Sequence, residues 1–195
     1  MTTDRLETFS DGVIAIIITV MVLELPRPKG AHLHALQHDV LLGLLTYLLS
    51  FVIIGIYWNN HHHMLRATVR INGSVLWANL HLLFWLSLFP FATDWMGRNH
   101  FARVPTAAYG VVLLLAAIAY YVLQTTIVRS EGAESSLKTA IGRDLKGKLS
   151  PVIYTAGIGL ALVNRWLGLA AYVVVALMWL VPDRRLESRL QETAP

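Results

Sequence analysis

Long apolar stretches alternate with short polar ones along this chain, and the ionisable residues gather between the apolar stretches. A helix needs ~20 apolar residues, with a range of roughly 17 to 25, to cross the hydrocarbon of a bilayer. The pattern therefore predicts an all-α, polytopic membrane protein with six transmembrane helices. The predicted spans are about residues 9–25, 40–58, 74–92, 106–128, 151–163 and 167–181.

Prolines mark several of the predicted boundaries. Pro26 follows the first span, Pro90 lies near the end of the third, and Pro151 opens the fifth. These positions suit proline, which lacks a backbone N–H and disrupts a helix interior. The last two spans are short, and we expect them to form a tight hairpin that turns at Asn164 and Arg165.

Composition narrows the functional classes. The 195 residues are 55% hydrophobic and 14% charged, whereas soluble domains are about 25% charged. No sequence cluster joins a nucleophile, a base and an orienting group, and no cofactor fingerprint is present, so we expect no enzyme and no cofactor. The chain has no cysteine, which excludes disulfides and thiolate metal sites. Residues 1–195 are interpreted as one six-helix unit.

The distribution of Lys and Arg predicts the orientation in the membrane and accounts for the net charge of +4 without a nucleic-acid partner. Positive residues favour the cytoplasmic side, so we expect both termini in the cytoplasm of a cell-membrane protein. The side predicted as cytoplasmic holds Arg5, Arg66, Arg70, Arg129, Lys138, Arg143, Lys146, Lys148, Arg184, Arg185 and Arg189. The opposite side holds Arg27, Lys29, Arg98, Arg103 and Arg165.

The first predicted helix carries a carboxylate at the edge of the membrane. Asp4, followed by Glu7, predicts an N-terminal cap and places Asp11 inside the helix. A charge there is costly unless it is paired or wetted, and Arg5 is a candidate partner. Asp11 either joins neighbouring helices through hydrogen bonds or faces a conduction path.

Farther along this helix, Ile16, Val20 and Leu23 have the i, i+4, i+7 spacing of one helical stripe, with Thr19 beside them. Such a stripe is ordinarily a packing surface. A stiff apolar stripe next to one hydroxyl can also form a hydrophobic gate.

Several motifs resemble the transmembrane protein 175 family of potassium channels. Arg5-x-x-x-Phe9-Ser10-Asp11 heads the first span and precedes an Ala-Ile-x-x-Thr sequence. Further matching segments are residues 57–62, 77–80 and 88–93. The resemblance covers the first three spans well and the last three only by hydrophobic pattern.

The resemblance implies a homotetramer of six-helix units with cytosolic termini, in which the first helices line a central pore. It implies a constriction at Ile16, Val20 and Leu23, with Thr19 as the hydroxyl layer associated with ion preference. It also implies a polar network on the cytoplasmic side. The implied network residues are Arg5, Phe9, Ser10, Asp11, Asn79 and either His61 or His62.

Three consecutive histidines, His61 to His63, depart from the family, in which a basic residue usually takes the third place. Consecutive helical residues point in different directions, so this run disfavours a metal site. A hydrogen-bonding or pH-sensing role is favoured instead.

Taken together, the sequence predicts a weakly to moderately selective potassium-permeable channel whose partners are potassium ions, the bilayer and further copies of the chain. The alternatives are a proton channel and a proton-coupled small-ion transporter. The absence of internal repeats or broken mid-membrane helices counts against a transporter.

Overall fold

A computed structural model describes residues 2–28, 31–32, 40–132, 135, 137–138 and 144–180. Seven helices are described there, and α4 and α5 form one interrupted membrane span, so the helices correspond to six spans. Their bounds are α1 (Thr3–Leu23), α3 (Leu41–Arg66), α4 (Gly73–Ser87), α5 (Phe89–Arg98), α6 (Arg103–Glu131), α8 (Leu145–Val163) and α9 (Arg165–Leu180). Lys29, Arg143, Val181, Arg184, Arg185 and Arg189, used above for orientation or span limits, lie outside the described residues.

Four described segments are long and apolar enough to cross a membrane: α1, α3, the α4–α5 pair and α6. Each agrees with a predicted span, but their ends differ. Helix α1 stops at Leu23 rather than residue 25, whereas α3 continues to Arg66 and carries all three histidines. Hydropathy marks the bilayer, whereas a helix continues into water wherever its backbone stays hydrogen-bonded, so α3 and α6 run beyond the predicted ends of the second and fourth spans.

The third span is interrupted near its middle, which corrects the expectation that the chain has no broken mid-membrane helix. Helix α4 ends at Ser87, and Pro90 lies in the first turn of α5. Proline is tolerated in a first turn but disrupts the interior of a helix, which explains the break at Leu88. The span continues to Arg98, beyond the predicted end at residue 92.

Helices α8 and α9 form the predicted hairpin, with only Asn164 between them. Its side-chain oxygen accepts a 3.0 Å hydrogen bond from the backbone N–H of Trp166. Helix α8 begins at Leu145, before the expected start of the fifth span at Pro151, and Asp144 caps it by accepting from Gly147 N at 2.9 Å.

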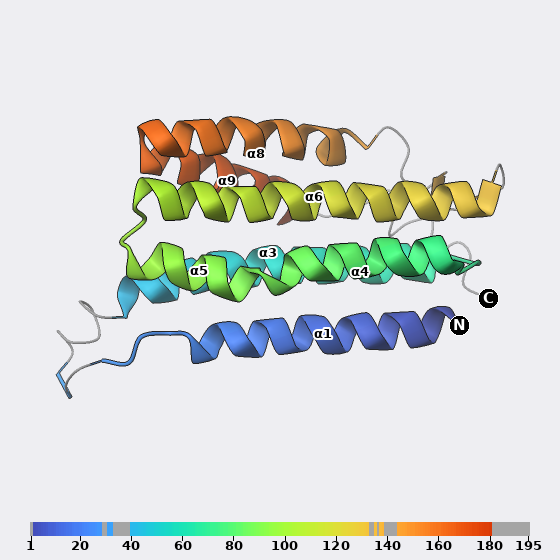
Figure 1. The fold of residues 1–195 in the computed structure, drawn as a ribbon, viewed down its shortest axis with the longest axis horizontal. Coiled ribbons are helices and arrows are strands. Elements are labelled where there is room, and N and C mark those ends of the chain that lie inside the picture. Colours follow the sequence, from blue (N-terminus) through green and yellow to red (C-terminus); the bar gives the residue numbers. More distant parts are fainter. Residues whose placement is uncertain are drawn as a thin grey trace.

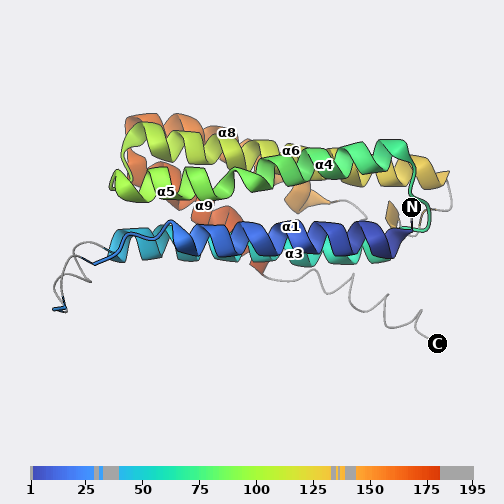
Figure 2. The ribbon, with the colours of Figure 1, turned by 60° about the horizontal axis from the view of Figure 1, so that its bottom comes forward.

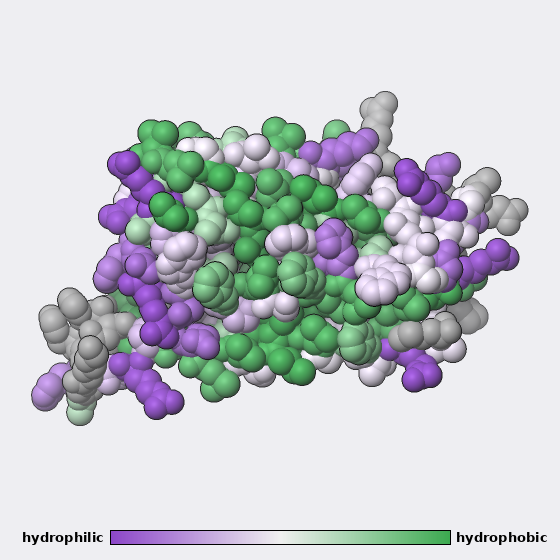
Figure 3. Space-filling view, in the orientation of Figure 1, coloured by the Kyte–Doolittle hydropathy of each residue, from purple (hydrophilic) through white to green (hydrophobic). Residues whose placement is uncertain are grey.

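The helices run side by side, and α1 lies at the edge of the bundle (Figures 1 and 2). Its main neighbours are α3, α4 and α5, whereas α6 is surrounded by α4, α5, α8 and α9. Figure 3 shows a broad apolar belt between two polar ends, as expected for a bilayer-spanning bundle. The α3–α4 connection, the end of α6 and the start of α8 lie at the same end as the start of α1 (Figure 1), as the predicted topology requires.

Candidate pore face and polar network of the first helix

Helix α1 has two distinct faces. The buried face, packed against α3, α4 and α5, consists of Leu6, Ser10, Ile14, Ile17 and Met21. The opposite face, here called the open face, consists of Arg5, Phe9, Gly12, Ile16, Thr19 and Leu23. Both sets recur at spacings of three or four residues, as one helix face requires. Helix α1 therefore uses one side to hold the subunit together and leaves the other without a partner in the described chain.

The predicted constriction residues lie on or beside the open face. Ile16 and Leu23 are 62% and 78% exposed, and Thr19 is exposed between them. Val20 is half-buried, at the border between the two faces. The Thr19 hydroxyl donates a 2.9 Å hydrogen bond to the Ile16 carbonyl, so its oxygen keeps lone pairs that can face a passing cation.

A chain of buried hydrogen bonds fastens the buried face to two other helices. His61 Nε2 donates to Asn79 Oδ1 at 2.7 Å, and Asn79 Nδ2 donates to Ser10 Oγ at 2.9 Å. The Ser10 hydroxyl donates in turn to the Leu6 carbonyl at 2.8 Å. All three side chains are fully buried, and they come from α3, α4 and α1. Of the two candidate histidines, His61 is therefore the one that joins Ser10 and Asn79.

Asp11 and Glu7 have other partners, on the flank of α1 that faces α3. Trp58 Nε1 donates to Asp11 Oδ1 at 2.9 Å, and His62 Nδ1 lies 2.6 Å from Glu7 Oε1. The indole of Trp58 stacks on the His62 ring, with the centroids 6.0 Å apart. Asp11 thus joins two helices, which is the first of the two roles that the sequence left open.

Two expectations for the start of α1 are corrected. Asp4 is not the cap, since α1 begins at Thr3 and no side chain caps it. Arg5 is exposed and makes no ion pair with Asp11 or with any other described residue. The Asp11 carboxylate accepts a hydrogen bond from the Trp58 indole N–H instead. Phe9 is also exposed, at 49%, and takes no part in the hydrogen-bond chain.

A second buried polar cluster lies toward the other end of the bundle. Ser50 Oγ is 2.7 Å from Thr93 Oγ1 and 2.9 Å from the Tyr109 hydroxyl. Sequence reasoning missed this cluster, because its members are 43 and 59 residues apart and belong to otherwise apolar spans. A serine and a threonine within predicted spans are signals of such bonding, but they do not identify the partner.

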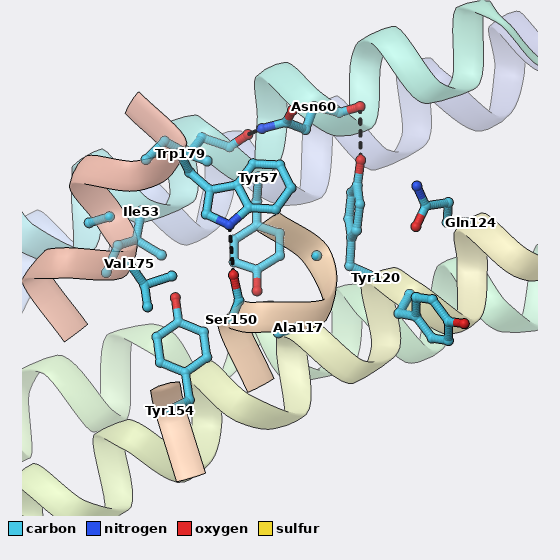
Figure 4. A pocket seen from close by; sticks show the side chains of 14 residues that line it. Ile53, Tyr57, Asn60, Ala117, Tyr120, Gln124, Ser150, Tyr154, Val175 and Trp179 are labelled. Carbon is cyan, nitrogen blue, oxygen red and sulfur yellow. Dashed lines mark hydrogen bonds between the residues drawn. The ribbon is translucent and has the colours of Figure 1, made fainter. Parts of the chain in front are cut away.

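A cavity of about 50 Å³ lies between α3, α6, α8 and α9. Figure 4 shows Tyr57 and Tyr154 among the side chains that line it, and Trp179 donating to Ser150 at its wall. Its volume holds a few water molecules, at ~10–15 Å³ each. No residue of α1 lines it, so this cavity is separate from the open face.

Comparison with known proteins identifies the family of this chain. Residues 5–90 match the family described as "Endosomal/lysosomal potassium channel TMEM175". A potassium channel of Chryseobacterium sp. is 51% identical over 192 residues, which cover 98% of this chain and all of that protein. The chain belongs to the TMEM175 family. The sequence resemblance is thus confirmed, and the protein is a channel and not an enzyme.

A solved structure and a vertebrate relative extend the comparison. The crystal structure of a lysosomal potassium-selective channel TMEM175 homologue from Chamaesiphon minutus has a TM-score of 0.76 and 27% identity. The match covers 92% of this chain and 96% of that one, which confirms the TMEM175 fold across all six spans. The endosomal/lysosomal proton channel TMEM175 of Danio rerio is 27% identical over 58% of this chain and 22% of its own length.

Sequence reasoning did not predict Glu7 or Trp58 as site residues of this TMEM175 chain. The signal was available in their spacing. Glu7 and Asp11 are one helical turn apart, as are Trp58 and His62, so each pair presents two polar groups on one helix side. The sequence does not give the rotation of α1 relative to α3, and this rotation brings the two pairs into contact.

Proposed function

We propose that this TMEM175 chain forms a potassium-permeable cation channel, as a homotetramer in which the open faces of four α1 helices surround the conduction path. Residues 1–195 supply one six-helix unit of this assembly. Ile16 and Leu23 form the apolar constriction together with Val20 at its border, and Thr19 supplies the hydroxyl layer. No cofactor takes part, because the permeant ion needs only a pathway.

The observation that carries this proposal is the open face itself. Ile16 and Leu23 are mostly exposed within the described chain, although α1 packs closely along its other side. Exposed leucines elsewhere, such as Leu48 of α3, are ordinary for a lipid-facing surface. The open face differs because it combines apolar residues with Thr19, Gly12 and Arg5. This mixture suits an axis that contains both water and ions better than lipid.

An apolar constriction accounts for gating and predicts modest selectivity. A narrow ring of Ile16 or Leu23 side chains excludes water, and a small increase in radius lets water and ions through. Such a ring offers a cation no ligands, unlike the carbonyl oxygens of a filter. The Thr19 hydroxyls are the only oxygens on the apolar part of the open face, so we expect a weak to moderate preference for potassium over sodium.

The buried network supports conduction indirectly. The bonds from His61 through Asn79 to Ser10 fix the rotation of α1 relative to α3 and α4. Because Ser10 and Ile16 are on opposite faces of one helix, this fixed rotation also fixes the direction of the open face. Asp11 contributes through its bond to Trp58. We place Arg5 and Phe9 at the cytoplasmic mouth, with both termini in the cytoplasm and the chain in the cell membrane.

Recordings from purified, reconstituted protein test the proposal. We expect Ile16→Asn to raise potassium conductance about tenfold, equivalent to removing ~1.4 kcal/mol of dewetting barrier, and to lower the potassium preference. Leu48→Asn is the matched control, because it places the same amide on an exposed α3 position. Equal currents for wild type and Ile16→Asn exclude Ile16 from the constriction.

Proton conduction through the same pathway is the second candidate, since vertebrate relatives are named proton channels. Ion substitution separates the two functions. Replacing potassium by a large impermeant cation under a pH gradient abolishes the current of a potassium pore and preserves that of a proton pore. A saturating flux without single-channel steps indicates a proton-coupled transporter instead.

A further inference from the structure

A cluster of possible metal ligands lies beside the polar network. Glu7 and Asp11 of α1 and His62 of α3 each place one ligand atom within 4.8 Å of the others. All three side chains are half-buried at the contact between α1 and α3. Neither the conduction path proposed above nor the bonds from His61 to Ser10 uses these three ligand atoms together.

One atom in this cluster has an unusual environment. His62 Nδ1 is shielded from solvent and forms no well-aligned hydrogen bond, although Glu7 Oε1 is only 2.6 Å away. This contact pairs an imidazole nitrogen with a carboxylate oxygen, and a metal ion can replace the proton between them, because both atoms are metal ligands. The Trp58 ring stacked on His62 further limits the directions in which the imidazole can turn.

The ligand chemistry selects a class of ion. Two carboxylates and one neutral imidazole carry two negative charges, which balance a divalent cation. An imidazole nitrogen favours zinc, cobalt or nickel over magnesium and calcium, which prefer oxygen alone. Tetrahedral zinc with ligands at ~2.0–2.1 Å separates its ligand atoms by about 3.4 Å. All three ligand atoms lie within 4.8 Å of one another, and Glu7 Oε1 and His62 Nδ1, 2.6 Å apart in the metal-free chain, would separate by about 0.8 Å to bind the ion.

The positions of the three ligands also remove the sequence argument against a metal site at the consecutive histidines. Consecutive histidines cannot share one ion because they point in different directions around the helix. The structure supplies the missing ligands from another helix, since Glu7 and Asp11 are one turn apart and both face His62. Only His62 of the three consecutive histidines is in this cluster.

We propose that Glu7, Asp11 and His62 bind a divalent transition-metal ion of the zinc class, with water completing the coordination, and that this ion clamps α1 to α3. The clamp joins the pore-lining helix to its neighbour at the end that holds the motif Arg5 to Asp11. Binding needs only one folded chain, so it stands independently of whether four α1 helices form the pore.

Calorimetric titration of the purified, metal-free full-length protein with Zn²⁺ tests this site. We expect His62→Gln and Glu7→Gln each to weaken binding to one site per chain at least tenfold, because each removes a direct ligand. His81→Gln is the matched control, since His81 is exposed on α4 and bonds only Trp85 of its own helix. Titrations of both ligand variants that match wild type overturn the proposal.

A thermal-shift measurement guards against misfolded variants. Ligands that bind only the folded state raise the unfolding temperature. We expect Zn²⁺ to raise it for wild type and His81→Gln, and to leave it unchanged for His62→Gln and Glu7→Gln, each of which melts cooperatively without metal. Millimolar Mg²⁺ should not reproduce the shift in wild type. An equal Zn²⁺ shift in all four proteins, or an equal shift with Mg²⁺, contradicts the assignment.

Discussion

The two faces of α1 are built from similar residues but have opposite environments. Ile14 on the buried face is 1% exposed, whereas Ile16, two positions later, is 62% exposed. Each face also carries one hydroxyl: Ser10 is fixed in a buried network, and Thr19 bonds only its own helix. Composition therefore does not distinguish the faces. What separates them is whether α3, α4 and α5 cover them.

One helix can therefore pack within its subunit on one face and remain available for conduction on the other. The buried face stabilises the subunit through close packing and satisfied hydrogen bonds. The open face contributes little to the stability of the single chain, and its residues are free to suit ions and water. Substitutions on the two faces should therefore separate folding from conduction.

The largest contrast is expected between Ile14→Ala and Ile16→Ala. Ile14→Ala leaves a cavity and should lower the free energy of unfolding by about 2 kcal/mol, the low end of values for buried Ile. The low end applies because lipid is itself apolar, so moving the Ile14 side chain from lipid into the core contributes less than moving it from water. Ile16→Ala should leave the stability of the single chain within about 0.5 kcal/mol. Thermal unfolding of both variants in the same detergent measures the difference. Equal losses of stability indicate that Ile16 is packed in the subunit.

A comparable loss is expected from Asn79→Leu, which removes both hydrogen bonds of the central network residue. His61 Nε2 then has no acceptor, and we expect a cost of about 1–3 kcal/mol for the buried unsatisfied group. Asn99→Leu is the control, because Asn99 is exposed and bonds only the nearby Trp95 carbonyl. Unfolding temperatures that fall equally for both variants argue against a structural role for the network.

Thr19→Val should have the smallest effect, and on conduction alone. Valine keeps the shape of threonine but removes the oxygen, which is worth about 1 kcal/mol to a bound cation. The ratio of potassium to sodium permeability should fall by up to about fivefold, with the unfolding temperature unchanged. Reversal potentials under bi-ionic conditions give the ratio. An unaltered ratio removes Thr19 from the hydroxyl layer.

Much of the architecture could be predicted from the sequence, since membrane spans leave strong signals. Apolar length located the spans, and Asn164 gave the hairpin turn. The motif from Arg5 to Asp11 identified the family. Helix ends were predicted less well, as at Arg66 and Leu145, because hydropathy reports the bilayer and not the length of a helix.

The candidate site was predicted only in part, for a geometric reason. Periodicity placed Ile16 and Leu23 on one stripe but gave no information about what lies opposite. The choice between His61 and His62 depends on a rotation of about 100° per residue, which only the contacts with Asn79 and Glu7 fix. For the same reason, Trp58 was missed as the partner of Asp11.

The open face is proposed to line the conduction path, and the absence of cysteine from the chain allows a direct measurement of its access to water. Ile16→Cys, Leu23→Cys and Leu48→Cys each introduce a single thiol, the last on the exposed side of α3. A charged, water-soluble thiol reagent is applied to both sides of a bilayer during potassium recording. We predict that the reagent reduces current through Ile16→Cys and Leu23→Cys channels and leaves Leu48→Cys unchanged. Unmodified current in both α1 variants, with wild-type conductance, contradicts a pore lined by α1.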